Sequence, residues 1–145
     1  MKRLFIRSLQ VELLNSLISK LHKHNIEVDI LDNRKQYKNL NKSSKKIYLT
    51  KKIGDFNITN ISIKTLIEIR KKKYDEIYIF HKQEDIYGFQ NIIILCFLFD
   101  SKKIYHLKYD HNTLNLEDKI IISKKILIKY FIQNMVSFTL MPIFI

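Results

Sequence analysis

The apolar positions of residues 1–31 change their spacing twice along the chain. Residues 4–6 form a short apolar run that is typical of a buried strand. Between residues 9 and 24 the apolar side chains recur on one helical face, at Leu13, Leu14, Leu17, Ile18 and Leu21. Residues 26–31 then alternate apolar and polar, which predicts a second strand. A helix between two strands gives a crossover long enough for the strands to pair in parallel.

The same alternation continues as far as residue 107. Further strands are predicted at residues 46–50, 76–80 and 103–107, and further helices at 61–73 and 89–99. A chain of 145 residues is long enough for one domain with one core. We therefore predict a single α/β domain with a mainly parallel sheet of about five strands and helices on both faces.

The C-terminal part has a different pattern. Residues 119–129 mix lysine and apolar residues at helical spacing, and residues 130–145 carry no charge. This uncharged run is shorter than the roughly 20 residues of a membrane-spanning helix. We expect residues 1–118 to form the α/β domain and residues 119–145 to form a separate basic-apolar segment.

Two interpretations of the basic-apolar segment are open. In one, it lies in a membrane interface with its lysines toward the headgroups, namely Lys124, Lys125 and Lys129. In the other, it is an apolar helix that packs on the sheet and ends at Pro142. The first predicts a peripheral position on the inner face of the plasma membrane, and the second a fully cytoplasmic protein.

The net charge of +12 raises the question of nucleic-acid binding. Only four of the 26 basic residues are arginine, the usual side chain for bidentate recognition of bases and phosphates. A lysine-rich, glycine-poor composition is also what an AT-rich genome imposes. We therefore rank compositional drift first, anionic lipid headgroups second and nucleic acid last.

A single cysteine, Cys96, lies within an apolar run. One thiol can form neither an internal disulfide nor a cysteine metal cluster, so we interpret Cys96 as a core residue of a cytoplasmic protein. Residues 1–3 lead directly into the first strand without the apolar stretch of a signal peptide. Glycine-rich phosphate loops and the common hydrolase and zinc motifs are also missing from the sequence, so no cofactor and no metal are expected.

The polar residues that follow predicted strands are the candidates for a site. His81, Glu84 and Asp85 follow the strand at 76–80, and Asp110 and His111 follow the strand at 103–107. Open α/β sheets bind ligands at the carboxyl edge of their strands, where these residues would lie. A histidine beside a carboxylate there could transfer protons, and a solvated loop is the alternative interpretation.

A resemblance to a known family rests on residues 70–79, whose sequence is Arg-Lys-Lys-Lys-Tyr-Asp-Glu-Ile-Tyr-Ile. This stretch resembles the segment of heptosyltransferase-like (family 9) glycosyltransferases in which a basic helix end, a Tyr-Asp pair and an apolar strand follow one another. Residues 87–91, which open an apolar helix, and residues 99–105, which enter the next strand, are similar to that group as well. The order of elements from residue 2 to residue 109 matches the N-terminal Rossmann-like domain of these GT-B enzymes.

The resemblance implies the acceptor-side domain of a glycosyltransferase for cell-envelope glycan assembly. Family members carry a Gly-Asp turn after the first strand, where this chain has Arg7 to Glu12 without glycine. Glu12 is the nearest acid and takes the catalytic position, with His81 as the second catalytic candidate. Glu84, Asp85, Asp110 and His111 are the substrate-binding candidates.

GT-B enzymes bind the sugar nucleotide mainly on a second domain, which this sequence lacks. Either that domain is a separate polypeptide, or the chain is a fragment or a degenerate relative of the family. We expect a separate nucleotide-sugar-binding subunit as partner, an anionic membrane surface as a second partner, and no catalysis by this chain alone. A non-enzymatic α/β adaptor that binds proteins is the first alternative. A basic nucleic-acid binder that uses the lysines of residues 42–52 and 70–73 is the second.

Overall fold

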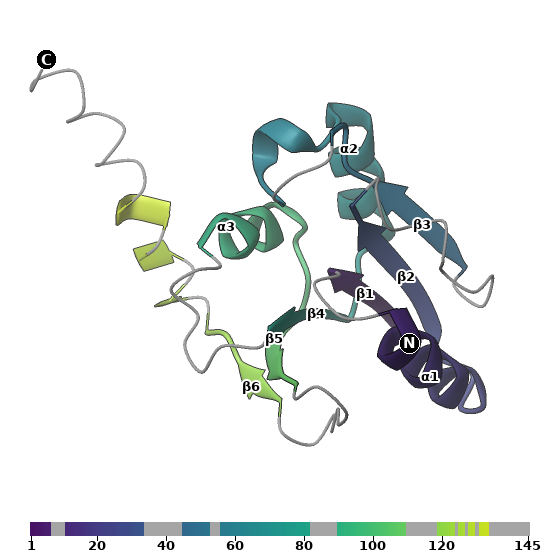
Figure 1. Cartoon of the computed structure of the whole chain (residues 1–145). Coiled ribbons are helices and arrows are strands. Elements are labelled where there is room, and N and C mark those ends of the chain that lie inside the picture. The colour runs from purple at the N-terminus through teal and green to yellow at the C-terminus, as the bar shows by residue number, and fades with distance from the viewer. Residues whose placement is uncertain are drawn as a thin grey trace, which may run out of the picture.

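The computed structural model describes residues 1–6, 11–33, 45–52, 56–81, 90–109, 119–123, 125–126, 128–129 and 131–133. Strands and helices alternate along this part of the chain (Figure 1). The elements are β1 (Lys2–Ile6), α1 (Val11–His22), β2 (Glu27–Asp32), β3 (Lys46–Leu49), the 3₁₀ turn η2 (Ile58–Asn60), α2 (Ile63–Lys72), β4 (Glu76–His81), α3 (Gln90–Leu98), β5 (Lys103–Lys108) and β6 (Ile120–Ile121). Every strand and helix predicted up to residue 107 is confirmed, with bounds that shift by two residues or fewer.

One six-stranded sheet has the strand order β3-β2-β1-β4-β5-β6. The first five strands in this order are parallel, and β6 is antiparallel to β5. The α/β class and the mainly parallel sheet are thus confirmed. The prediction of about five strands misses β6, which lies in a stretch that was expected to be helical. Its two isoleucines pair with β5 and place Ile122 in the core.

Alternate residues of the strands build two separate cores. Leu4 and Ile6 of β1 point to the face that α2 and α3 cover, whereas Phe5 points to the face that α1 covers. Figure 1 shows the helices on the two sides of the sheet. The α1 side is rich in aromatic rings, with Phe5 edge-on to Tyr78 and to Phe80 at 5.4 and 5.2 Å between ring centres. The prediction of helices on both faces is therefore confirmed.

Local sequence explains where α2 begins and ends. The Ser62 hydroxyl accepts a hydrogen bond from the Thr65 backbone N–H at 3.0 Å, which satisfies one of the free N–H groups of the first turn. Basic side chains fill the last turn, where they suit the negative end of the helix dipole. Lys73 follows with a left-handed backbone (φ 48°), a conformation that ends helices. The basic cluster at residues 70–73 therefore has a structural explanation.

The helix α3 is apolar almost all round and lies against the sheet. Residues 92–96 are buried, and Leu95 is fully enclosed. Phe97 is the exception, with 42% of its surface exposed, and its ring stacks on Phe131 at 5.8 Å. The described residues from 125 to 133 are helical and exposed. In the part of the chain that the structure describes, no helix is long and apolar enough to span a membrane.

Candidate functional site

The carboxyl edge of the sheet is defined by the ends of its parallel strands. The chain runs from β1 outward through β2 to β3, and then crosses to β4 and β5 on the other side of β1. The strand order therefore reverses between β1 and β4. In open α/β sheets a crevice forms at such a reversal, outside the carboxyl ends of the strands, and ligands bind there. Ile6 and His81 end the two strands that flank this point.

The structure places the catalytic candidates at or near this edge. Glu12 is an exposed residue in the first turn of α1, the helix that follows β1. His81 is the last residue of β4 and pairs in register with Lys108 of β5. The substrate-binding candidates Glu84, Asp85, Asp110 and His111 lie outside the described residues. Glu12 thus follows β1 and His81 ends β4, and these two strands are neighbours in the sheet.

Asp32 occupies the carboxyl end of β2, a position that binds the ribose in dinucleotide folds. Here the residue is fully buried, and its Oδ1 atom accepts a hydrogen bond from the Asn33 backbone N–H at 2.7 Å. The backbone N–H of Thr50, after β3, donates to the Asp32 carbonyl at 3.1 Å. The backbone carbonyl of Asp32 thus holds the ends of β2 and β3 together, and its side chain is enclosed.

A buried carboxylate on β2 is the strongest electrostatic feature that the sequence did not reveal. Asp29 has 2% of its side chain exposed, and its Oδ2 atom accepts hydrogen bonds from both Lys72 and Tyr74. The Tyr74 hydroxyl also lies 3.4 Å from that of Tyr48 on β3. Burial, and next the hydrogen bond with Asp29, raise the pKa of Tyr74 far above its usual range, so its hydroxyl remains a donor.

This Asp29 cluster lies toward the amino end of the strands, since Asp29 is paired with Lys46, the first residue of β3, and Tyr74 precedes the start of β4. It joins four segments: β2, β3, the end of α2 and the turn before β4. The Oδ1 atom of Asp29 is buried without a hydrogen-bond partner among the described residues. We assign the cluster a structural role, because it is enclosed and lies away from the carboxyl edge.

Asp75, the other half of the Tyr-Asp pair, is also explained by the fold. Its Oδ2 atom accepts from the Lys2 backbone N–H at 2.9 Å, and its Oδ1 atom lies 2.6 Å from the Lys102 amine. The Lys102 ion pair, followed by the backbone hydrogen bond from Lys2, lowers the pKa of Asp75. Tyr74 and Asp75 therefore fix β4 between its neighbours at the amino edge of the sheet.

A second buried ion pair lies on the α1 side of the sheet. The Arg3 guanidinium donates from Nε to Glu76 Oε2 at 2.7 Å, and the Tyr78 hydroxyl donates to the same oxygen at 2.9 Å. Burial raises the pKa of Tyr78. Because each of the three polar groups has a partner, this cluster too is a structural link between β1 and β4.

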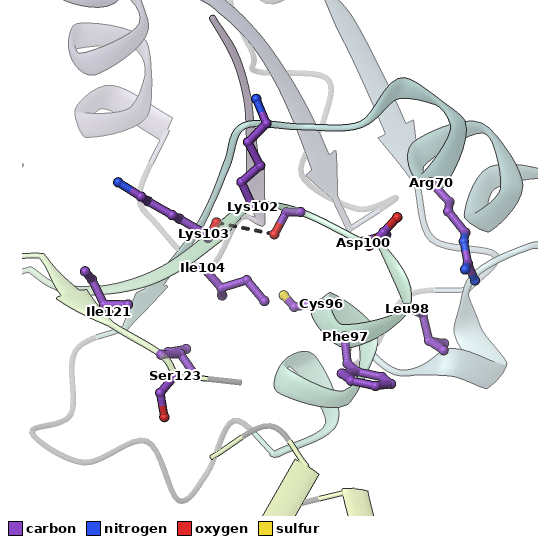
Figure 2. Close-up of a pocket in the computed structure, with 12 residues that line it drawn as sticks. Arg70, Cys96, Phe97, Leu98, Asp100, Lys102, Lys103, Ile104, Ile121 and Ser123 are labelled. Carbon is purple, nitrogen blue, oxygen red and sulfur yellow. Dashed lines mark hydrogen bonds between the residues drawn. The ribbon is translucent and has the colours of Figure 1, made fainter. Parts of the chain in front are cut away.

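One groove of about 370 Å³ lies at the amino edge, where α3 ends and β5 begins. In Figure 2 the Cys96 and Ile104 side chains point toward one another within it, whereas the amines of Lys102 and Lys103 point away. Burial raises the pKa of the Cys96 thiol, so it is a protonated core residue as predicted. This groove lies at the opposite edge of the sheet from the carboxyl ends of the strands, where α/β proteins bind ligands.

Within the described ranges, no group of three or more His, Cys, Asp or Glu side chains could hold a metal ion. Comparisons with protein-family models, with curated proteins and with solved structures found no match to this chain. The class of the protein is therefore assigned from its structure alone. It is an α/β domain with a mostly parallel six-stranded sheet.

Proposed function

We propose that this chain is a Rossmann-like, acceptor-side domain of a GT-B glycosyltransferase that works with a separate nucleotide-sugar-binding subunit. The observation that carries the proposal is the strand order β3-β2-β1-β4-β5, with helices on both faces and a reversal between β1 and β4. This order is that of doubly wound dinucleotide-binding domains. The site would lie at the carboxyl edge, close to Glu12 and His81.

Two features favour a domain that needs a partner for catalysis. Catalysis in GT-B enzymes takes place in a cleft between two domains, and a single α/β unit supplies one wall of such a cleft. The two buried carboxylates that the structure describes in ion pairs, Asp29 and Glu76, hold the sheet together and do not face a cleft. Chemistry would therefore depend on the exposed groups at the carboxyl edge together with groups of the partner.

The test is a transfer assay with labelled nucleotide sugars and envelope glycan acceptors extracted from the same cells. The isolated chain should transfer nothing, and the chain with its co-purified partner should transfer sugar. The variant Glu12→Gln should reduce that transfer by at least about a hundredfold if Glu12 is the acid or base. Asp100→Asn is the matched control, since Asp100 is also an exposed acid and lies at the opposite edge. Equal activity of the two variants would reject the assignment of Glu12.

A non-enzymatic adaptor is the second candidate, and one observation favours it. Ile63 and Ile67 lie one turn apart on α2 with 73% and 48% of their surfaces exposed. Exposed isoleucines at this spacing are typical of a helix face that binds another protein. Sugar transfer by the isolated chain would rule out the adaptor, whereas loss of a bound partner in Ile63→Ser would support it.

A further inference from the structure

The exposed apolar side chains concentrate on one part of the molecule. The structure describes eleven large apolar residues that are exposed, and seven of them belong to α3, β6 or the helical residues after β6. We call these seven the apolar face; they are Phe97, Ile120, Ile121, Ile126, Ile128, Phe131 and Ile132. The stacked rings of Phe97 and Phe131 connect the end of the chain to α3, and Figure 1 shows the helical residues beside that helix.

The charges of residues 119–145, which carry six of the seven residues of the apolar face, have one sign. Residues 119–145 include four lysines and no acidic residue. Lys125 and Lys129 are exposed and lie one turn apart, between the isoleucines of the face. Neither lysine has an ion-pair partner among the residues that the structure describes. An apolar surface bordered by free lysines is the pattern of segments that insert into the headgroup region of a membrane.

We propose that the apolar face binds the surface of an anionic lipid bilayer. A second copy of the chain is a poor occupant, because the exposed lysines beside the two faces would repel each other in a protein of net charge +12. Nucleic acid would engage the lysines and leave the exposed isoleucines and phenylalanines in water. An anionic bilayer would bind both kinds of side chain, since the headgroups attract the lysines and the acyl boundary accepts the apolar side chains.

The inference rests on the proposed function only for its biological setting, since the face is defined by exposed side chains. Binding is measured by co-sedimentation of the full chain with vesicles of phosphatidylglycerol and phosphatidylcholine in equal parts. Vesicles of phosphatidylcholine alone are the comparison. We expect binding to the anionic vesicles, weaker binding at high salt and little binding to the neutral ones.

Two pairs of variants locate the binding surface. Ile128→Ser with Ile132→Ser should reduce the affinity for anionic vesicles at least tenfold, because less apolar surface is inserted. The matched control is Ile63→Ser with Ile67→Ser, which removes two exposed isoleucines at the same spacing from α2. This control should leave the affinity for anionic vesicles unchanged. All four isoleucines are about half exposed or more, so the folded state should tolerate both pairs. A thermal melt of each variant verifies this.

Lys125→Gln with Lys129→Gln should weaken binding about fivefold for each lysine removed. Lys20→Gln with Lys23→Gln makes the same change of net charge at the end of α1, where both lysines are also exposed, and should have a much smaller effect on binding. Equal losses for the two lysine pairs would mean that net charge alone drives binding, and would overturn the inference. So would the absence of binding to anionic vesicles. Neither outcome bears on sugar transfer, which is assayed in detergent without vesicles.

Discussion

Tyr74→Phe tests whether the Asp29 cluster stabilises the fold. Tyr74 is 1% exposed, and its hydroxyl donates to the buried carboxylate of Asp29. The substitution keeps the ring and removes only the hydroxyl, so no large cavity forms. Among the described residues, Asp29 then keeps the Lys72 amine as its one partner for a side-chain hydrogen bond.

The expected cost follows from the kind of bond that is lost. A hydrogen bond to a charged group contributes about 1.5–3 kcal/mol to stability, and a buried carboxylate that loses a donor is at the upper part of such a range. The contact between the hydroxyls of Tyr74 and Tyr48 is long at 3.4 Å and adds little. We therefore expect Tyr74→Phe to lower the free energy of unfolding by about 2–3 kcal/mol.

Urea denaturation monitored by circular dichroism measures this change. Tyr105→Phe is the matched control, because the Tyr105 ring is 4% exposed in the same sheet but its hydroxyl has no hydrogen-bond partner among the described residues. The control should cost less than about 0.5 kcal/mol. In a double-mutant cycle with Asp29→Asn, the coupling energy should exceed about 1 kcal/mol. Equal costs for the two tyrosine variants, or no coupling, would show that the Asp29 cluster does not stabilise the fold.

Three further predictions concern the core, the response to pH and the thiol. Leu95→Asp should leave the domain unfolded at room temperature, because an unpaired charge would replace a fully buried side chain. The control Asn91→Asp, at an exposed position of the same helix, should keep the melting temperature within a few degrees of that of the unchanged protein. The folded pKa of Asp75 is below its unfolded value, so its ion pair stabilises the protein above the unfolded pKa of about 4 and less as the pH falls. Lys102→Gln should therefore reduce the loss of stability in acid, and an identical pH profile would contradict this. Cys96 should react with a thiol reagent only as fast as the domain opens, and rapid reaction without denaturant would place it outside the core.

Periodicity predicted most of the fold because each element buries a continuous face. The helical spacing of Leu14, Leu17, Ile18 and Leu21 corresponds to the buried side of α1. Periodicity did not predict the strand β6, because the spacing of its residues is ambiguous. Two isoleucines within a lysine-rich stretch fit a helical period as well as an extended one, and only pairing with β5 decides between them.

The clusters at Asp29 and Glu76 could not be predicted from spacing. Each joins residues that are far apart in sequence, such as Asp29 with Tyr74 or Arg3 with Glu76, and therefore depends on the order and register of the strands. Tyr74 and Asp75 belong to the segment that resembles family 9 glycosyltransferases, and the structure gives both a role at the amino edge of the sheet. The signal for Asp29 was an acidic residue within an otherwise apolar strand, which is rare in a core without a partner.

The proposal that this chain is one half of a two-part glycosyltransferase is tested most directly by affinity purification of the full chain from its own cells in detergent. The bound proteins and the ratio of nucleic-acid to protein absorbance would both be recorded. The proposal predicts recovery from the membrane fraction, free of nucleic acid, with a protein that carries a nucleotide-sugar-binding domain and confers sugar transfer on the complex. Recovery from the soluble fraction, either alone or with nucleic acid, would contradict it.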